Sequence, residues 1–255
     1  MTKFLPWLMP ILFAPVGGSV VGVLVRRLPA HRPVLLARSQ CESCGRTLSV
    51  PDLVPIASYL VFRGRCRICR AAIDPFHLAI ELAAVTIAVW VAAVESDPGL
   101  LWIDCLLGWG LLALAWIDID HMRLPDALTL PLLAAGLSVQ AAFAPDRFVE
   151  CVLGAVIGYV AFRAIAIVYA RLRGRDGLGA GDAKLLAVAG AWVGWAALPG
   201  VVFLASLLAI GAVAIKGMRD QAIDGTAAIP FGPFLALAFW ITYLHEPLGF
   251  LGTGS

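Results

Sequence analysis

Long apolar runs separated by short polar connections occupy most of the chain. A helix that crosses a membrane needs about 20 consecutive, mostly apolar residues. Runs of roughly this length lie at residues 5–25, 78–95, 99–117, 125–144, 149–170, 183–199, 200–216 and 230–250. The sixth and seventh runs are almost continuous, and we place the break between them at Pro199-Gly200 because proline and glycine interrupt helices. The pattern predicts an all-α polytopic membrane protein with about eight transmembrane helices.

The composition agrees with this prediction. Of the 255 residues, 61% are hydrophobic and only 14% are charged, whereas soluble domains are about half apolar and a quarter charged. The first run has only Lys3 ahead of it and continues into Arg26-Arg27 without a small-x-small cleavage site. We therefore interpret it as a membrane helix and not as a cleavable signal peptide.

One sizeable polar segment interrupts the apolar pattern. It divides the chain into a first transmembrane helix (1–25), an insert (26–77) and a transmembrane core (78–255). Two C-x2-C pairs with 21 residues between them lie in the insert: Cys41, Cys44, Cys66 and Cys69. Four thiolates on two tight turns are typical of a tetrahedral Zn²⁺ site. We expect a closed, structural site that the insert needs in order to fold, since so small a segment has little apolar core.

Basic residues are distributed unevenly among the connections. Nine arginines lie between the first two predicted helices, and most of the later basic residues, apart from Arg147 on the opposite side and Arg163 inside a span, lie in alternate connections: Arg123, Arg171, Arg173, Arg175, Lys184, Lys216 and Arg219. Eight helices put all of these on one side, which the positive-inside rule identifies as the cytoplasm, with both termini outside. Topology explains the basic residues, so they do not indicate nucleic acid binding. A reducing cytoplasm also disfavours the alternative interpretation of the four cysteines as disulfides or a redox pair.

Two acidic motifs occur at the ends of apolar runs. Asp118 ends the third run, before Leu124-Pro125 restarts the chain, and Asp182 follows Gly177-Leu178-Gly179-Ala180-Gly181 at the start of the sixth. We expect these glycines to let the backbone turn sharply. The predicted topology puts both motifs at the cytoplasmic membrane face, where ionisable groups indicate function. Two neighbouring carboxylates do not both ionise easily, so one can act as base and the other as acid.

Each of these charged residues also has a plainer interpretation. Asp182 at the start of a helix is an ordinary cap, and Asp118 is a solvated loop carboxylate beside a basic residue. Asp120 and Asp126 are ion-pair partners or caps unless they act directly. Lys184 either extends to the lipid headgroups or takes part in the chemistry.

Several motifs occur in a characteristic order: the two C-x2-C pairs, Arg63-Gly64-Arg65-Cys66, Glu81, the segment from Asp118 to Asp126, Gly179-Ala180-Gly181-Asp182-Ala183-Lys184, and Pro230-Phe231-Gly232-Pro233. In this order they resemble the type IV prepilin leader peptidases, membrane aspartic proteases of the Gly-x-Gly-Asp type, over nearly the whole chain. The resemblance implies that Asp118 and Asp182 are the catalytic pair. The supporting residues that it implies are Gly179, Gly181, Lys184, Asp120 and Asp126.

The resemblance also implies an activity and a location. Enzymes of this family remove a basic leader from prepilins or pseudopilins, ahead of an apolar N-terminal helix, at the cytoplasmic face of the bacterial inner membrane. Many then methylate the new N-terminal amine with S-adenosylmethionine, and the products build type IV pili or type II secretion pseudopili. The expected partners are therefore such substrates and the lipid bilayer.

Some positions depart from the family pattern. Gly18-Ser19-Val20-Val21-Gly22 lacks the usual asparagine, Leu53-Val54-Pro55 replaces Asn-Ile-Pro, and the segment from Phe76 to Glu81 differs from Tyr-Pro-x-Val-Glu. The changes cluster in the region linked to methylation and not at the aspartates. Proteolysis is thus expected to be intact, while methylation stays open. The S-adenosylmethionine site is unknown, with the surroundings of Glu81 as its candidate place.

Three alternatives to a bifunctional enzyme remain open at this stage. The first is a leader peptidase without methyltransferase activity. The second is a zinc-stabilised transporter, although transport favours acidic groups near the middle of the membrane. The third is an assembly factor that docks a partner through the insert, which leaves the aspartate pair without a role.

Overall fold

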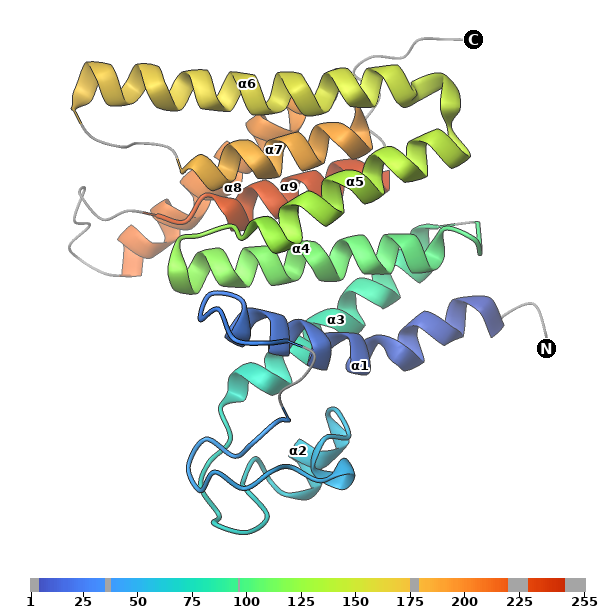
Figure 1. Ribbon diagram of the computed structural model, residues 1–255, viewed down its shortest axis with the longest axis vertical. Helices are drawn as coiled ribbons and strands as arrows, with labels where there is room; N and C mark the ends of the chain where they lie inside the picture. The colour runs from blue at the N-terminus through green and yellow to red at the C-terminus, as the bar shows by residue number, and fades with distance from the viewer. Residues whose placement is uncertain (1–4, 35–37, 96, 175–178, 220–228, 246–255) are drawn as a thin grey trace. The chain divides into compact units, whose positions relative to one another are not determined.

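The computed structural model describes residues 5–34, 38–95, 97–174, 179–219 and 229–245. The chain divides into two compact units, Met1–Ala113 and Leu114–Ser255, and each is described here by itself. Within the described residues the regular structure is helical, apart from two isolated antiparallel bridges that join Gln40 to Thr47 and Arg65 to Ala72 (Figure 1). The prediction of an all-α membrane protein is confirmed.

A helix occupies each of the eight predicted places. Six of these helices are apolar and long enough to cross a membrane: α1 (Leu5–Arg27), α3 (Pro75–Val94), α4 (Leu101–His121), α5 (Asp126–Phe143), α6 (Phe148–Arg173) and α8 (Leu198–Arg219). The other two, α7 (Ala180–Val193) and α9 (Gly232–His245), have 14 residues each. Fourteen residues rise only about 21 Å, less than the roughly 30 Å of a bilayer core.

The break after α7 lies earlier than the sequence predicts. Gly194 adopts a positive φ of 80° and ends the helix at Val193. The next helix, α8, already begins at Leu198, so Pro199 lies in its first turn. Proline is tolerated there because the amide it lacks has no partner in a first turn. The expected break at Pro199-Gly200 is therefore wrong by about four residues.

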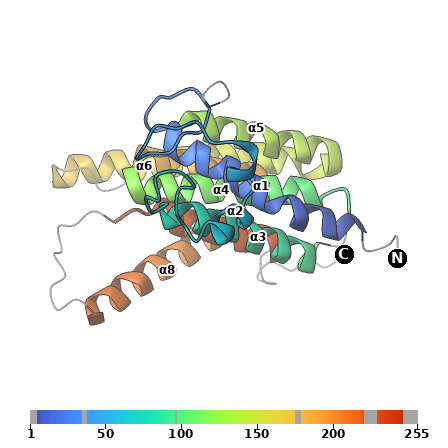
Figure 2. The same cartoon turned by 90° about the horizontal axis from the view of Figure 1, so that it is seen from below.

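The first unit is built around the pair α1 and α3, which pack along one another (Figure 2). The helices approach closely at Gly18, where a Cβ atom would lie 2.6 Å from the Cα atom of Glu81. Trp109 of α4 lies against Gly17, and its indole Nε1 donates to the Ala84 carbonyl oxygen at 3.1 Å. Between α1 and α3 the chain forms the insert, whose described residues include a 3-10 turn (Val50–Asp52) and the short helix α2 (Ala57–Val61) beside the two bridges.

The second unit surrounds α7, in which 11 of the 14 residues are buried. This helix packs against α5, α6, α8 and α9 (Figure 1). It meets α6 backbone to backbone, because a Cβ atom on Gly190 would lie 2.2 Å from the carbonyl of Gly154. Small residues at such crossings let transmembrane helices approach closely. The Gly154–Gly190 contact thereby holds the last part of α7 against α6.

Gly190→Ala is expected to destabilise the protein. The added methyl group overlaps the Gly154 backbone, so the two helices must separate, and overpacking of this kind costs about 1–3 kcal/mol. The melting temperature in detergent measures the effect. Gly211→Ala in α8 is the matched control, because its Cβ atom meets open space and alanine stabilises a helix by about 0.5–1 kcal/mol relative to glycine. Equal melting temperatures for the two variants would contradict the packing described.

Candidate active site and metal centre

Asp118 lies in the last turn of α4 and is only 6% exposed. Its Oδ2 atom accepts a hydrogen bond of 3.0 Å from the backbone amide of Gly232, the first residue of α9. A Cβ atom at position 232 would lie 2.6 Å from the same oxygen, so only glycine fits against the carboxylate. A helix N-terminus presents unpaired amides that favour an anion. The start of α9 therefore holds and orients the Asp118 carboxylate.

Asp182 lies in the first turn of α7 and is also only 6% exposed. Its carboxylate is near enough to Asp118 for their charges to interact, so the structure brings the two aspartates together. The side chain also interacts with the backbone amide of Gly179, the N-cap residue of α7. Asp182 thus has the capping contact that the plainer interpretation expects, in addition to its place beside Asp118.

The glycines before Asp182 serve close approach and not a sharp turn. Gly179 has an ordinary φ of −64°, and Gly181 lies in helical conformation without a positive φ. A Cβ atom on Gly181 would lie 2.9 Å from the Cβ atom of Leu124, a buried residue of the α4–α5 connection. The expectation of a sharp turn is wrong for these two residues, and Gly177 lies outside the described residues. The missing side chain lets the α4–α5 connection reach the start of α7.

The other predicted supporting residues lie at the surface of this site. Lys184 of α7 forms an ion pair with Asp126, the first residue of α5, and the Asp126 side chain is 57% exposed. Asp120 is exposed as well, two residues beyond Asp118. Asp126 is therefore an ion-pair partner that joins two helix starts. The two buried carboxylates of this group are those of Asp118 and Asp182.

The sequence alone does not predict two contacts of the site, that of Gly232 with Asp118 and that of Leu124 with Gly181. Gly232 is 114 positions from Asp118, and its motif was noted only as part of the family pattern. Leu124 was read as the restart of an apolar run. Neither pairing has a local signature, since both are tertiary contacts. The glycine between two prolines at 230–233 was the available signal, because such a residue often marks a close approach of backbone to another group.

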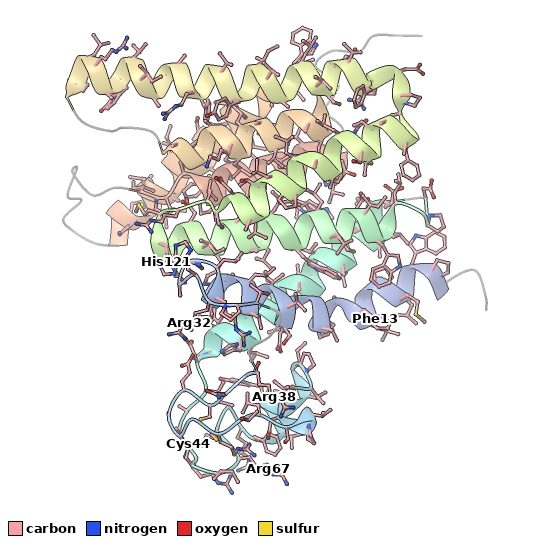
Figure 3. The ribbon with its side chains drawn as sticks, viewed as in Figure 1. Phe13, Arg32, Arg38, Cys44, Arg67 and His121 are labelled. Carbon is pink, nitrogen blue, oxygen red and sulfur yellow. The ribbon has the colours of Figure 1, made fainter. Side chains whose placement is uncertain are left out.

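The four cysteines of the insert form one cluster. Their sulfur atoms all lie within 4.8 Å of one another, and the Cys41 and Cys69 sulfurs are 3.8 Å apart. A tetrahedron with Zn–S bonds of about 2.3 Å has sulfur–sulfur edges of about 3.8 Å. The cluster therefore fits a Zn²⁺ ion, as the spacing predicts. Figure 3 shows the insert with Cys44 labelled among its side chains.

The two halves of the cluster repeat the same backbone turn. In the first, the Cys41 amide donates to the Arg46 carbonyl and Gly45 has a positive φ of 69°. In the second, the Cys66 amide donates to the Ala71 carbonyl and Arg70 has a φ of 59°. Hydrogen bonds from backbone amides lower the pKa of the first thiol of each pair, that of Cys66 to about 6. Both turns thus favour the thiolate, which is the form that binds metal.

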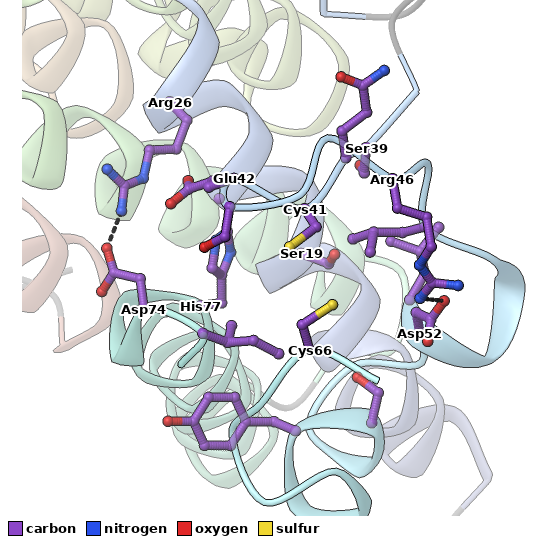
Figure 4. Close-up of a pocket in the computed structure, with 18 of the residues that line it drawn as sticks. Ser19, Arg26, Ser39, Cys41, Glu42, Arg46, Asp52, Cys66, Asp74 and His77 are labelled. Carbon is purple, nitrogen blue, oxygen red and sulfur yellow. Dashed lines mark hydrogen bonds and ion pairs between the residues drawn. The ribbon is translucent and has the colours of Figure 1, made fainter. Parts of the chain in front are cut away.

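A cavity of about 640 Å³ lies in the first unit, enclosed by α1, α3 and the insert (Figure 4). Two ion pairs lie on its walls, between Arg26 and Asp74 and between Arg46 and Asp52. Glu81 lies at its edge and accepts a 2.6 Å hydrogen bond from the Ile56 amide. Further lining groups include Cys41, Cys66, Tyr59, Phe62 and His77. The cavity therefore combines charges of both signs with aromatic rings.

Comparisons with known proteins give matches over most of the chain. Residues 105–215 match the model of the type IV leader peptidase family, and residues 12–94 match that of the bacterial peptidase A24 N-terminal domain. Prepilin leader peptidase/N-methyltransferases from Aeromonas salmonicida and Pseudomonas aeruginosa are each 36% identical to the chain; the matches cover 94% and 92% of this chain and 92% and 88% of those proteins. One from Burkholderia pseudomallei is 42% identical over 82% of this chain and 67% of its own length. No solved structure matches the chain.

Proposed function

The chain belongs to the type IV leader peptidase family, and we propose that it removes the leader of prepilins with Asp118 and Asp182 as its two catalytic carboxylates. One observation carries this assignment: two buried aspartates, from the end of α4 and the start of α7, lie close enough to interact. Two carboxylates in a shared, water-poor site are the groups that aspartic peptidases use.

The pair supplies general acid–base catalysis of amide hydrolysis. One carboxylate, ionised, takes a proton from a water molecule, whose oxygen attacks the scissile carbonyl carbon. The other carboxylate, protonated, donates its proton to the carbonyl oxygen. The C–N bond then breaks as the amine leaves with a proton from the first carboxyl group. The two groups titrate as one pair, so neither role belongs to a single residue.

The surroundings of the pair support this chemistry. The Gly232 amide occupies Oδ2 of Asp118 and leaves the second oxygen for water or substrate. The Leu124–Gly181 contact and the Asp126–Lys184 ion pair connect the α4–α5 region to the start of α7. These contacts reduce the freedom of both carboxylates, and fixed geometry accounts for much of an enzyme's rate.

The cavity of the first unit fits S-adenosylmethionine, and we assign it as the methyl-donor site. Its volume lies in the range of roughly 300–1,000 Å³ that is typical of small-molecule sites. Glu81 and Asp74 would offer carboxylates to the cationic parts of the donor, an arginine of the lining would pair with its carboxylate, and Tyr59 and Phe62 would pack against its adenine ring. When bound, the donor supplies a methyl group to the amine that cleavage exposes.

We assign the active site to the cytoplasmic face of the bacterial inner membrane. Arg171 and Arg173 end α6, Lys216 lies near the end of α8, and Arg123 follows α4. These helix ends are on the same side as the two aspartates in the predicted topology, and the positive-inside rule assigns that side to the cytoplasm. A basic leader on the cytoplasmic side of the membrane would therefore lie next to the two aspartates.

Mass spectrometry of a co-expressed prepilin tests the function. We expect a product that has lost its leader and carries one added methyl group on the new N-terminus. A shortened product without the methyl group would retain the peptidase and remove the methyl-donor assignment. An uncleaved prepilin, with enzyme that is folded in the membrane, would overturn the proposal.

Gly232→Ala is expected to lower the rate of cleavage about 100-fold, because a displacement of a catalytic group by about 1 Å has effects of this size. The added methyl group would overlap Oδ2 of Asp118 and remove the room for the hydrogen-bonded geometry. Cleavage assays in detergent measure the loss. Gly200→Ala in α8, where the new Cβ atom meets open space, is the control. Equal rates in the two variants would show that the start of α9 does not position Asp118.

A further inference from the structure

The longest uncharged run of the insert contains the short helix α2. Residues 53–62 read LVPIASYLVF and carry no charged side chain. Basic residues follow this run at once, and the structure leaves all four of them exposed: Arg63, Arg65, Arg67 and Arg70. Apolar side chains next to a cluster of arginines are typical of segments that lie in the interface of a membrane.

The two sides of α2 have different surroundings. Ser58, Tyr59 and Phe62 line the cavity of the first unit. Leu60 and Val61 lie outside the cavity lining, and their side chains are 64% and 72% exposed. A helix at the surface of a soluble domain turns its apolar side towards the core and its polar side towards water. On α2 the outward side is apolar, and exposed apolar surface of this kind marks a binding face.

A hydrogen bond places α2 beside a membrane-spanning helix. Ile56, the N-cap residue of α2, donates its backbone amide to Oε2 of Glu81 at 2.6 Å. Glu81 lies six residues after Pro75, the first residue of α3, which corresponds to a rise of about 9 Å along the helix. The 20 residues of α3 are about the number that a bilayer core requires. The start of α2 therefore lies alongside the first turns of the span.

Helix α1 gives the same placement. Ser19 and Gly22 of α1 line the same cavity as the inward side of α2. Ser19 lies eight residues before Arg27, where α1 ends, and this corresponds to about 12 Å along the helix. The insert therefore extends along the flanks of both α1 and α3, below the ends of these helices, and does not project freely into the cytoplasm.

We propose that the outward side of α2, formed by Leu60 and Val61, lies in the interface of the cytoplasmic leaflet, and that the arginines after it bind acidic lipid headgroups. Three observations favour lipid as the occupant. The segment lies along two membrane-spanning helices, its outward side chains are apolar, and within the described part of the chain Arg63 and Arg70 have no ion-pair partner. Acidic lipids supply both an apolar surrounding and a phosphate for the arginines. The insert is thereby a membrane-bound element as well as a metal-binding one.

Photo-crosslinking in the bacterial inner membrane tests this proposal. One variant carries p-benzoylphenylalanine in place of Leu60 and another carries it in place of Val61; mass spectrometry of the irradiated full-length protein identifies the attached molecule. The same probe at Ile210, which is exposed in the middle of α8, is the control for contact with lipid. We expect phospholipid adducts at both positions of α2, in variants whose melting temperatures match that of the wild type. Adducts with another protein, or no adduct at either position while Ile210 reacts, would overturn the inference.

Lipid composition separates headgroup binding from apolar contact alone. In nanodiscs with equal amounts of phosphatidylglycerol and phosphatidylcholine, the adducts at Val61 should contain phosphatidylglycerol about fivefold more often, since one arginine near a membrane surface favours acidic lipid by about this factor. Arg63→Gln combined with Arg70→Gln should bring the ratio of the two lipids close to one; neither arginine lines the cavity. Equal shares of the two lipids without these substitutions, or a preference that the double variant retains, would overturn the assignment of headgroup binding to the arginines.

Discussion

Asp182→Asn is expected to reduce prepilin cleavage by at least about 10³-fold, within the range that general acid–base catalysis contributes. Asparagine keeps the size of the side chain but can neither accept a proton from water nor take its turn as the acid. Asp118→Asn should be equally inactive, although its Oδ1 atom can still accept the hydrogen bond from the Gly232 amide. Cleavage is measured by mass spectrometry of the co-expressed prepilin and by the rate in detergent.

The double variant and a surface variant complete this experiment. Because the two carboxyl groups act as one unit, the double variant should be no worse than either single one. Asp126→Asn removes an exposed ion pair with Lys184, and exposed pairs contribute only about 0–1 kcal/mol, so its rate should stay within a few fold of wild type. Near-normal cleavage by either Asp118→Asn or Asp182→Asn would remove that residue from the catalytic pair.

Loss of zinc is expected to unfold the insert and abolish methylation. Cys44→Ser removes one of four ligands, and this should weaken metal binding by more than the roughly 10–100-fold that loss of an outer hydrogen bond costs. Small metal sites of this kind fold only with the metal bound. Since Cys41 and Cys66 also line the cavity, its wall should collapse with the cluster. Limited proteolysis of the insert and the methylated fraction of the product measure the two effects.

Two comparisons make the zinc prediction specific. Ile68→Ala changes an exposed side chain that lies between two ligands and does not line the cavity, and it should leave metal content and methylation unchanged. Prepilin cleavage should decline less than methylation, because the described contacts of Asp118 and Asp182 lie in the second unit. A chelated or Cys44→Ser protein that methylates normally would exclude a structural metal at the cysteine cluster.

The sequence was sufficient to predict the helices and the cysteine cluster because both depend on local information. An apolar run long enough to cross a membrane forms a helix wherever it lies, since no other structure satisfies its backbone in lipid. A C-x2-C pair likewise specifies its own turn, as the equivalent geometry at Cys41 and Cys66 shows. The length of α7 was less predictable, because Gly194 ends it within an apolar stretch.

The sequence does not predict the contacts that build the candidate site, because these contacts join segments that are far apart in the chain. Gly181 and Gly232 are needed for the space they leave beside Leu124 and Asp118, and that space exists only after the helices pack. The spacing of Gly177, Gly179 and Gly181 predicts a sharp turn, because a turn is the usual local structure that requires glycine. The sequence indicates the surroundings of Glu81 as a candidate place for the S-adenosylmethionine site but does not predict a cavity there. The walls of this cavity come from three separate segments, which are α1, the insert and α3. Only the folded chain defines them.

The division of the chain at residue 113 has a consequence for how this enzyme can change over time. The cavity and the cysteine cluster belong to the first unit, and the aspartate pair with its described partners belongs to the second. Substitutions that spoil one chemistry therefore need not touch the other, and natural selection can relax on methylation while it maintains proteolysis. The unusual residues at 18–22, 53–55 and 76–81 all fall in the first unit.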